Sequence, residues 1–256
     1  MIKIIITNIL KLLSYEIRKI HKVNSLTFKE DDRNFFRENY KKCEKESLNI
    51  SEQRFLSLFQ SVNYIYDNNI DGDLVECGVF RGGSAMMMAK SSLRFAKKIN
   101  NLKKIWLYDT FEGMANPSIY DVNISNEKAV IELEKINKKK NKKDIWAYSP
   151  IDYVKERMRD IGYKDVKYIK GLVEQTLLNN TPDKISLLRL DTDFYESTKI
   201  ELEILYPKLE VGGIIIIDDY GHWKGCKKAV DEYFINKKNI FFQQIDYSGL
   251  IGVKTK

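Results

Sequence analysis

The 256-residue sequence predicts an α/β fold, a doubly wound and mostly parallel sheet preceded by a helical segment. From residue 73 onward, short apolar runs alternate with amphipathic helical patterns. The apolar runs lack the alternation of a half-exposed strand, which is typical of strands covered by helices on both faces. We expect a helical extension over residues 1–70 and the main domain over residues 71–256.

Three helical stretches are expected in the first 70 residues. The opening segment is apolar, but polar residues from Lys3 to Lys11 interrupt it well short of the roughly 18 residues that a membrane span requires. We therefore predict an amphipathic helix without stable membrane insertion, packed on the body or on a second subunit of a homo-oligomer, with membrane-surface contact as the alternative. The third stretch is the clearest, because Ser51 can cap a helix whose apolar residues recur at helical spacing up to Tyr66.

The main domain is predicted to contain seven strands with helices between them. Helical patterns begin near Gly83, Asn126, Ile151, Tyr195 and Lys224. The strand runs cover residues 73–79, 105–109, 166–171, 185–191, 212–219, 241–246 and 250–256. Only residues 247–249 separate the last two runs, which predicts an antiparallel hairpin on one edge of the sheet. A parallel sheet that ends in such a hairpin is the Rossmann-like arrangement of class I methyltransferases, although topology alone does not establish function.

The turn after the first strand is the expected cofactor site, because ligands of doubly wound sheets bind at the carboxyl ends of the strands. Gly78, Gly82 and Gly83 allow a tight turn and a close approach to a ligand. Their spacing is not the G-x-G-x-x-G of a dinucleotide-binding loop. Glu76 would repel a diphosphate there, but it suits the ammonium group of an amino-acid ligand.

The second strand ends at Asp109, whose carboxylate can accept hydrogen bonds from both hydroxyls of a ribose. Together with Glu76 it predicts a nucleoside that carries an amino acid, as S-adenosylmethionine does, rather than a dinucleotide; the alternative is that these acids cap helices or turns. Arg81 and Ser84 are candidates for binding the ligand's carboxylate, with a surface role as their alternative. The other residues assigned to the cofactor are Val79, Thr110, Phe111, Gly171 and Leu172.

Four aspartates follow two strands that are expected to be neighbours, Asp191 and Asp193 after one and Asp218 and Asp219 after the other. Neighbouring strands lie about 4.8 Å apart, so these carboxylates would gather at one edge of the sheet. Their repulsion costs several kcal/mol unless a cation or protons intervene. An all-oxygen set favours Mg²⁺, with Mn²⁺ or Ca²⁺ as substitutes. We expect the metal at Asp191, Asp218 and Asp219.

The chemistry expected at this cluster is deprotonation of an acceptor hydroxyl, which then attacks the methyl group of the cofactor in line. Asp191 would contribute through the metal. Asp193 is the expected general base, with capping of the next helix as its alternative. His222 is the competing base or a ligand of the substrate, unless it is simply packed beside Trp223.

Composition argues against several other classes. The formal net charge of +7 favours acidic partners only weakly. The basic run at residues 138–143 lacks interleaved aromatic residues that would stack on bases, so no nucleic-acid partner is expected. Three cysteines without metal-type spacing indicate neither a disulfide framework nor a zinc site, which fits a reducing, cytoplasmic location.

Five motifs carry a resemblance to a known family: DGDLVECGVFRGGSAMMM, YDTFEGM, VKYIKGLVEQTL, LLRLDTDFYEST and GGIIIIDDYGHWKGCKKAVDEYF. Over residues 51–234 the sequence resembles the macrocin O-methyltransferase family. The resemblance implies metal-dependent methyl transfer from S-adenosylmethionine to a hydroxyl of a sugar, a glycan or a natural-product glycoside. Carried over by position, it implies metal ligands at Asp191, Asp218 and Asp219 and the base at Asp193. Relatives with these motif variants look like enzymes of bacterial surface-polysaccharide biosynthesis.

The resemblance does not extend to the acceptor, because the lysine-rich region 117–149 matches the family poorly. Some members have glycine where Thr192 stands, so the loop is expected to sit differently here. Catechol-type or other small-molecule acceptors therefore remain an alternative. A further alternative is a short-chain NAD(P)-dependent sugar oxidoreductase, since Tyr195 and Lys199 form Y-x-x-x-K, but the glycine pattern argues against it. An inactive scaffold is disfavoured by the complete set of four aspartates.

Overall fold

The computed structural model describes residues 29–96, 101–137 and 146–256. The chain divides into two compact units, residues 1–35 and 36–256, and every contact described below lies within the second unit. The helix expected at the start of the chain and the basic run at residues 138–143 lie outside the described residues, and the domain boundary at residue 70 stays a prediction. No helix in the described ranges has both the length and the apolar character needed to cross a membrane.

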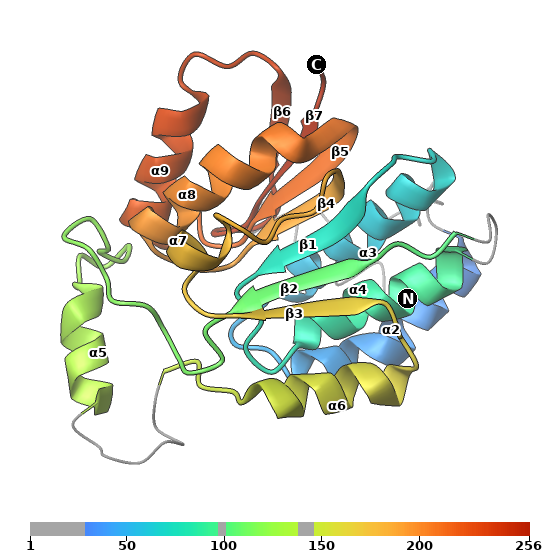
Figure 1. The fold of residues 1–256 in the computed structure, drawn as a ribbon, viewed down its shortest axis with the longest axis horizontal. Coiled ribbons are helices and arrows are strands. Elements are labelled where there is room, and N and C mark those ends of the chain that lie inside the picture. The colour runs from blue at the N-terminus through green and yellow to red at the C-terminus, as the bar shows by residue number, and fades with distance from the viewer. Residues whose placement is uncertain (1–28, 97–100, 138–145) are drawn as a thin grey trace, which may run out of the picture. The chain divides into compact units, whose positions relative to one another are not determined.

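A seven-stranded sheet in the order β3-β2-β1-β4-β5-β7-β6 forms the centre of the second unit (Figure 1). Its strands are β1 Asp73–Cys77, β2 Ile105–Asp109, β3 Val166–Lys170, β4 Ile185–Leu190, β5 Leu209–Ile217, β6 Ile240–Gln244 and β7 Leu250–Lys254. Strands β1 to β5 pair in parallel, and β7 lies antiparallel between β5 and β6. The predicted doubly wound sheet and its C-terminal hairpin are confirmed.

Burial explains why the strand runs are apolar on both faces. β1, β2 and β4 are buried along almost their whole length, and so is the second half of β5, from Ile214 to Ile217. β3 is an edge strand, in which exposed positions alternate with partly or fully buried ones, the buried one being Ile169. The order of winding reverses between β1 and β4, and such a switch point is where ligands of these sheets bind.

Helices cover both faces of the sheet (Figure 1). One layer contains α3 (Glu52–Asp67), α4 (Gly83–Phe95) and α6 (Ile151–Ile161), and the other contains α7 (Val173–Thr176), α8 (Tyr195–Leu205) and α9 (Lys224–Phe234). The Ser51 side chain accepts a hydrogen bond from the backbone N–H of Arg54 and caps α3 as predicted. From Phe36 onward, α2 (Glu30–Glu44) packs its aromatic side chains against Phe55 and Phe59 of α3.

Two helices differ from the sequence prediction. α5 (Ala129–Asn137) begins after Asn126 rather than at it, because Asn126 has a φ of +65°, which a right-handed helix does not allow. The Asn123 side chain accepts hydrogen bonds from the backbone amides of Ser125 and Glu127 and fixes this turn. α7 is a single turn after β3 that the sequence pattern did not predict.

Candidate active site

A cavity of about 410 Å³ lies at the carboxyl ends of the strands. This volume is in the range of small-molecule binding sites. Most of the expected site residues line it: Gly78, Val79, Asp109, Thr110, Gly171, Leu172, Asp191, Asp193, Asp218, Asp219 and His222. The expected residues outside its lining are Glu76, Arg81, Gly82, Gly83, Ser84 and Phe111.

Gly78 lets the end of β1 touch the loop after β4. Its φ is +83°, and a Cβ atom there would lie 2.0 Å from the carbonyl oxygen of Asp191. The backbone N–H of Asp191 donates in turn to the carbonyl of Cys77 at 2.8 Å. Gly83 is required for a different contact, because its Cβ atom would lie 2.3 Å from the carbonyl oxygen of Cys43. Gly78 and Gly83 of the expected cofactor turn therefore allow close packing, and their contact with a ligand stays a prediction.

The carboxylate of Asp109 borders the cavity and also holds two turns. Its Oδ2 accepts hydrogen bonds from the backbone amides of Val79 and Phe80 at 2.7 and 3.0 Å, and its Oδ1 accepts one from Phe111 at 2.7 Å. Burial raises the pKa of Asp109, and these three amides oppose that rise. The turn-capping role is present in the structure. The ribose contact stays a prediction. Oδ2 already accepts two hydrogen bonds, so the lone pair left for a ribose hydroxyl is on Oδ1, which accepts one backbone amide.

The residues expected at the amino-acid end of the cofactor lie outside the cavity. Glu76 is fully buried and accepts a hydrogen bond from the Arg189 guanidinium at 2.6 Å. The Ser84 hydroxyl is also buried, 3.3 Å from the same guanidinium. Arg81 is exposed, and its guanidinium lies 5.2 Å from the centre of the Phe80 ring. The structure brings Glu76 and Ser84 together at Arg189, and the cofactor contacts of all three stay predictions.

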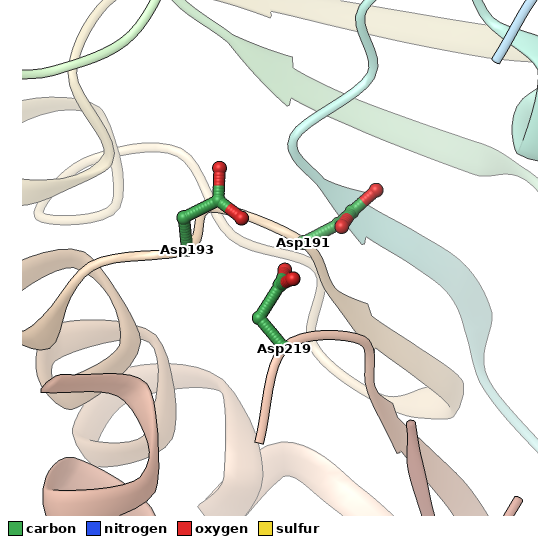
Figure 2. Close-up of side chains that lie close together, drawn as sticks. All are labelled: Asp191, Asp193 and Asp219. Carbon is green, nitrogen blue, oxygen red and sulfur yellow. The ribbon is translucent and has the colours of Figure 1, made fainter. Parts of the chain in front are cut away.

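Three of the four aspartates meet at the ends of β4 and β5 (Figure 2). One carboxylate oxygen from each of Asp191, Asp193 and Asp219 lies within 4.8 Å of the other two. Two ligands of the same Mg²⁺ or Ca²⁺ ion lie at most about 4–5 Å apart, twice the metal–oxygen bond length. One buried oxygen of Asp219 has no hydrogen-bond partner among the described residues. The donor set therefore fits a hard divalent cation.

Burial and mutual repulsion raise the pKa of all three carboxyls. Burial is the main cause at Asp193, and together with the charges of Asp191 and Asp218 it raises the pKa of Asp193 to about 7. The pKa values of Asp191 and Asp219 also lie well above the usual range, mainly because of burial and also because of their acidic neighbours. A cation bound among these groups would favour their charged forms and reverse the shifts.

Asp218 is held apart from this group by two arginines, Arg54 and Arg189, which we call the arginine clamp. The Asp218 Oδ1 accepts a hydrogen bond from Arg189 at 2.6 Å, and its Oδ2 pairs with Arg54. Arg189 also contacts Asp191 at 2.8 Å. The structure thus groups Asp193, rather than Asp218, with Asp191 and Asp219. The role of Asp218 as third metal ligand stays a prediction.

The arginine clamp was not predicted from the sequence. Arg189 interrupts the otherwise uncharged and buried strand β4, and a charged residue at such a position indicates an internal ion pair. Arg54 carries no comparable signal, because it lies on an amphipathic helix and reaches Asp218 across 164 positions of sequence. It also donates to Asp246 at 3.0 Å and to the carbonyl of Asn49 at 2.6 Å.

Aromatic side chains border the cavity beside the aspartates. The rings of Trp146, Phe194 and Trp223 form a cluster with centroids 5.6 to 6.2 Å apart, and both tryptophans line the cavity. His222 lies edge-on to Trp223. Burial lowers the pKa of His222, so its imidazole is neutral at neutral pH, and its Nδ1 has no partner among the described residues. A neutral imidazole fits either a base or a ligand of an acceptor hydroxyl.

Tyr195 and Lys199, the pair that would serve a short-chain oxidoreductase, do not line the cavity. The Tyr195 hydroxyl donates a hydrogen bond to Glu232 at 2.8 Å, and the ammonium of Lys199 lies 5.8 Å from the centre of the Tyr195 ring. Both groups therefore belong to the contact between α8 and α9. Their position argues against hydride chemistry at this pair.

Comparisons with known proteins agree with this architecture. The chain matches the macrocin O-methyltransferase (TylF) family over residues 6–251. It is 34% identical to demethyldecarbamoylnovobiocin O-methyltransferase of Streptomyces niveus and 31% identical to 8-demethyl-8-(2,3-dimethoxy-alpha-L-rhamnosyl)-tetracenomycin-C 4'-O-methyltransferase of Streptomyces olivaceus. Each match covers 72% of this chain and 66% of the relative.

A solved structure shows the same fold. The O-methyltransferase NovP superposes with a TM-score of 0.66 at 32% sequence identity, and the match covers 81% of each chain. The family match extends over nearly the whole chain and includes the strand ends that form the cavity. Together, these findings show that the chain belongs to the macrocin O-methyltransferase family, a family of methyltransferases.

Proposed function

We propose that this chain is an S-adenosylmethionine-dependent O-methyltransferase that methylates a sugar hydroxyl of a glycan or natural-product glycoside with the help of Mg²⁺ or Mn²⁺. The observation that carries the proposal is the convergence of Asp191, Asp193 and Asp219 on a cavity that also reaches the turn after β1. Family membership supports methyl transfer, and one relative is named for a rhamnosyl-bearing tetracenomycin.

The part of the cavity at the ends of β1, β2 and β3 suits the nucleoside of S-adenosylmethionine. Gly78 and Asp109 line this part of the cavity, and Oδ1 of Asp109 keeps a lone pair that suits a ribose hydroxyl. Leu172 adds apolar surface beside them. We assign the nucleoside to these three residues. Glu76 is fully buried against Arg189, so we expect this ion pair to support the turn after β1 without contact between Glu76 and the cofactor.

The charge balance of the site supports a divalent cation. The arginine clamp supplies two positive charges. Four carboxylates pair with it, those of Glu76, Asp191, Asp218 and Asp246. Two more, those of Asp193 and Asp219, lie close to Asp191. Uncompensated charge in a buried site is costly, so protons or a cation must balance it. We expect Asp191 and Asp219 to hold the cation, with Asp218 or Asp193 as the third ligand.

When bound, the cation favours the ionised form of an acceptor hydroxyl, and S-adenosylmethionine offers an electrophilic methyl group. Asp193 accepts the hydroxyl proton, because its carboxylate lies beside Asp191 and Asp219 in the cavity. Its pKa is about 7 in the metal-free site, and a bound cation would lower it. Trp146 and Trp223 exclude water and orient the acceptor beside that carboxylate. His222 is the second candidate for the proton.

The test is turnover by the full-length protein with S-adenosylmethionine against a panel of glycosides, nucleotide sugars and catechols, each with Mg²⁺ or with EDTA. We expect a methylated sugar, identified by mass spectrometry, and loss of the product in EDTA. Methylation of catechols but not of sugars would overturn the proposal that the acceptor is a sugar. Full activity in EDTA would overturn the proposal that the reaction depends on a metal. If S-adenosylhomocysteine does not raise the melting temperature, the proposal that S-adenosylmethionine is the cofactor is overturned.

A further inference from the structure

A fully buried carboxyl on α8, that of Glu201, contacts the loop that carries the aspartates but does not line the cavity. The Thr192 hydroxyl lies 3.0 Å from Glu201 Oε1 and 3.1 Å from Oε2. The Cys77 thiol, at the end of β1, also forms a hydrogen bond with this carboxyl. Glu201 thus connects the two strand ends, β1 and β4, that border the site.

The loop held by this contact has an unusual backbone. Asp193 has a φ of +67°, in the left-handed region that costs an L-residue roughly 1–2 kcal/mol. On one side, the backbone N–H of Asp191 is fixed to Cys77 at 2.8 Å, and on the other, the backbone N–H of Phe194 donates to the Thr192 carbonyl at 2.7 Å. A strained conformation persists only when its surroundings hold it. The Ser197 hydroxyl donates to the Thr192 carbonyl at 3.3 Å, and the side chain of Thr192 is a further anchor of the loop.

We propose that Thr192 and Glu201 form a latch that positions Asp193 for proton transfer. Glu201 acts as a positioning residue through Thr192 and does not line the cavity itself. The inference rests on the proposed function, in which Asp193 is the base. A carboxyl without solvent is costly to bury, and a core residue of the same shape would pack there without that cost. The hydrogen bond to Thr192, which an apolar side chain cannot form, offsets that cost.

The protonation of Glu201 is consistent with this role. Burial raises the pKa of Glu201 well above its usual range, with Glu174 adding to the rise and Thr192 opposing it. Burial thus favours the neutral form of the carboxyl, which adds no negative charge to the site. A neutral carboxyl both accepts and donates hydrogen bonds, as does the amide of glutamine, so the latch needs its polar atoms and not its charge.

A double-mutant cycle with Thr192→Val and Glu201→Met tests the latch in the full-length protein. Each change removes one side of the contact at nearly constant volume. We expect each to lower kcat about five- to tenfold, the rate equivalent of one buried hydrogen bond, with little change in the KM for S-adenosylmethionine. Because both remove the same interaction, the double variant should be no slower than either single variant.

Conservative variants separate positioning from general stability. Thr192→Ser and Glu201→Gln keep the hydrogen bond and should stay within about threefold of the wild-type kcat. Tyr163→Phe is the matched control, because it removes a buried hydrogen bond to the Lys103 carbonyl. Lys103 lies just before the amino end of β2, whereas the site lies at the carboxyl ends of the strands, so this change should lower stability without changing kcat. If Glu201→Met does not fold, a comparison of Thr192→Val with Thr192→Ser tests the latch, because only the valine variant loses the hydrogen bond.

Hydrogen–deuterium exchange of the peptide over residues 190–195 provides a readout that does not need turnover. Faster exchange there in Thr192→Val and Glu201→Met, but not in Thr192→Ser, supports the latch even if no acceptor is methylated, in which case only the proposed function fails. Wild-type kcat and wild-type exchange in both apolar variants would overturn the latch, and so would fully additive losses in the double variant.

Discussion

Asp193 combines a raised pKa with a fixed position, as a general base requires. Asp193→Asn keeps the size of the side chain and removes its basicity, so we expect kcat to fall roughly 100-fold or more. A Mn²⁺ titration should give nearly the wild-type affinity, because Asp191 and Asp219 remain. In the wild type, activity should rise with pH along a limb at or below about 7, since a cation lowers the pKa of Asp193 from its metal-free value. Loss of Mn²⁺ binding in Asp193→Asn would instead make Asp193 a ligand.

Arg189 gathers carboxylates from three adjacent strands, since its guanidinium pairs with Glu76, Asp191 and Asp218. Arg189→Met fills the space but leaves these carboxyls buried without a partner, so we expect a loss of about 3–5 kcal/mol in the free energy of unfolding. Urea unfolding followed by circular dichroism measures this loss. A cost below about 1 kcal/mol would show that protonation of the carboxyls replaces the arginine.

An exposed ion pair is the control for Arg189. Lys184 and Asp71 lie 2.8 Å apart at the surface, where water screens both charges. Lys184→Met should therefore leave the midpoint of urea unfolding nearly unchanged. A loss as large as that of Arg189→Met would mean that the measurement reports the removal of any positive charge, and not the burial of the arginine clamp.

Residue roles were predictable where the chemistry is local and not where it depends on distant partners. Asp191, Asp193 and Asp219 could be placed together because each follows the end of a strand. The environment of Asp218 could not be predicted in this way. Its partner Arg54 comes from α3, and no spacing rule connects a helix residue to a strand end 164 positions away.

At the scale of elements, α8 depends on a residue from another part of the chain. Its own N-cap, Phe194, has no side-chain acceptor, and the carboxylate of Asp121 accepts a hydrogen bond from the Tyr195 backbone N–H at 2.8 Å instead. The same carboxylate also accepts one from Ser118 and fixes the segment before α5. The cap thereby ties that segment to the helix that follows the aspartates.

Asp121→Ala should therefore weaken two elements at once. We expect a loss of about 1–2 kcal/mol in the free energy of unfolding and faster proteolytic cleavage within residues 117–131. Asp121→Asn keeps one acceptor oxygen and should lose clearly less stability than the alanine variant. Equal losses in both variants would show that the charge of Asp121, and not its hydrogen bond to Tyr195, stabilises the cap.

The elements themselves follow from sequence to different degrees. All seven strands were predicted because each is a short apolar run between turn signals, and a sheet covered on both faces requires such runs. The start of α5 was misplaced, because a side-chain turn at Asn123 overrides the helical pattern. α7 has only four residues, Val173–Thr176, which is too short to show helical periodicity.

At the scale of the whole molecule, the fold brings acidic strand ends to one buried place and so makes the metal-free protein sensitive to pH. The pKa of Asp193 is about 7 in the folded state and about 3.9 in an unfolded chain. A group whose pKa is raised by folding binds its proton more tightly in the native state. Its contribution to stability is therefore fully present below about pH 4 and is lost as the pH rises through about 7.

The metal-free protein should accordingly be less stable at about pH 8 than at about pH 5, by roughly 1–2 kcal/mol for Asp193 after allowance for its partial exposure. Thermal unfolding in EDTA at both pH values measures this difference, and Asp193→Asn, which cannot titrate, isolates the contribution of Asp193. Mg²⁺ should raise the melting temperature more at the higher pH, because there it neutralises carboxylates and does not have to displace protons. An equal effect of Mg²⁺ at both pH values, or no effect, would mean that the aspartates do not bind the cation.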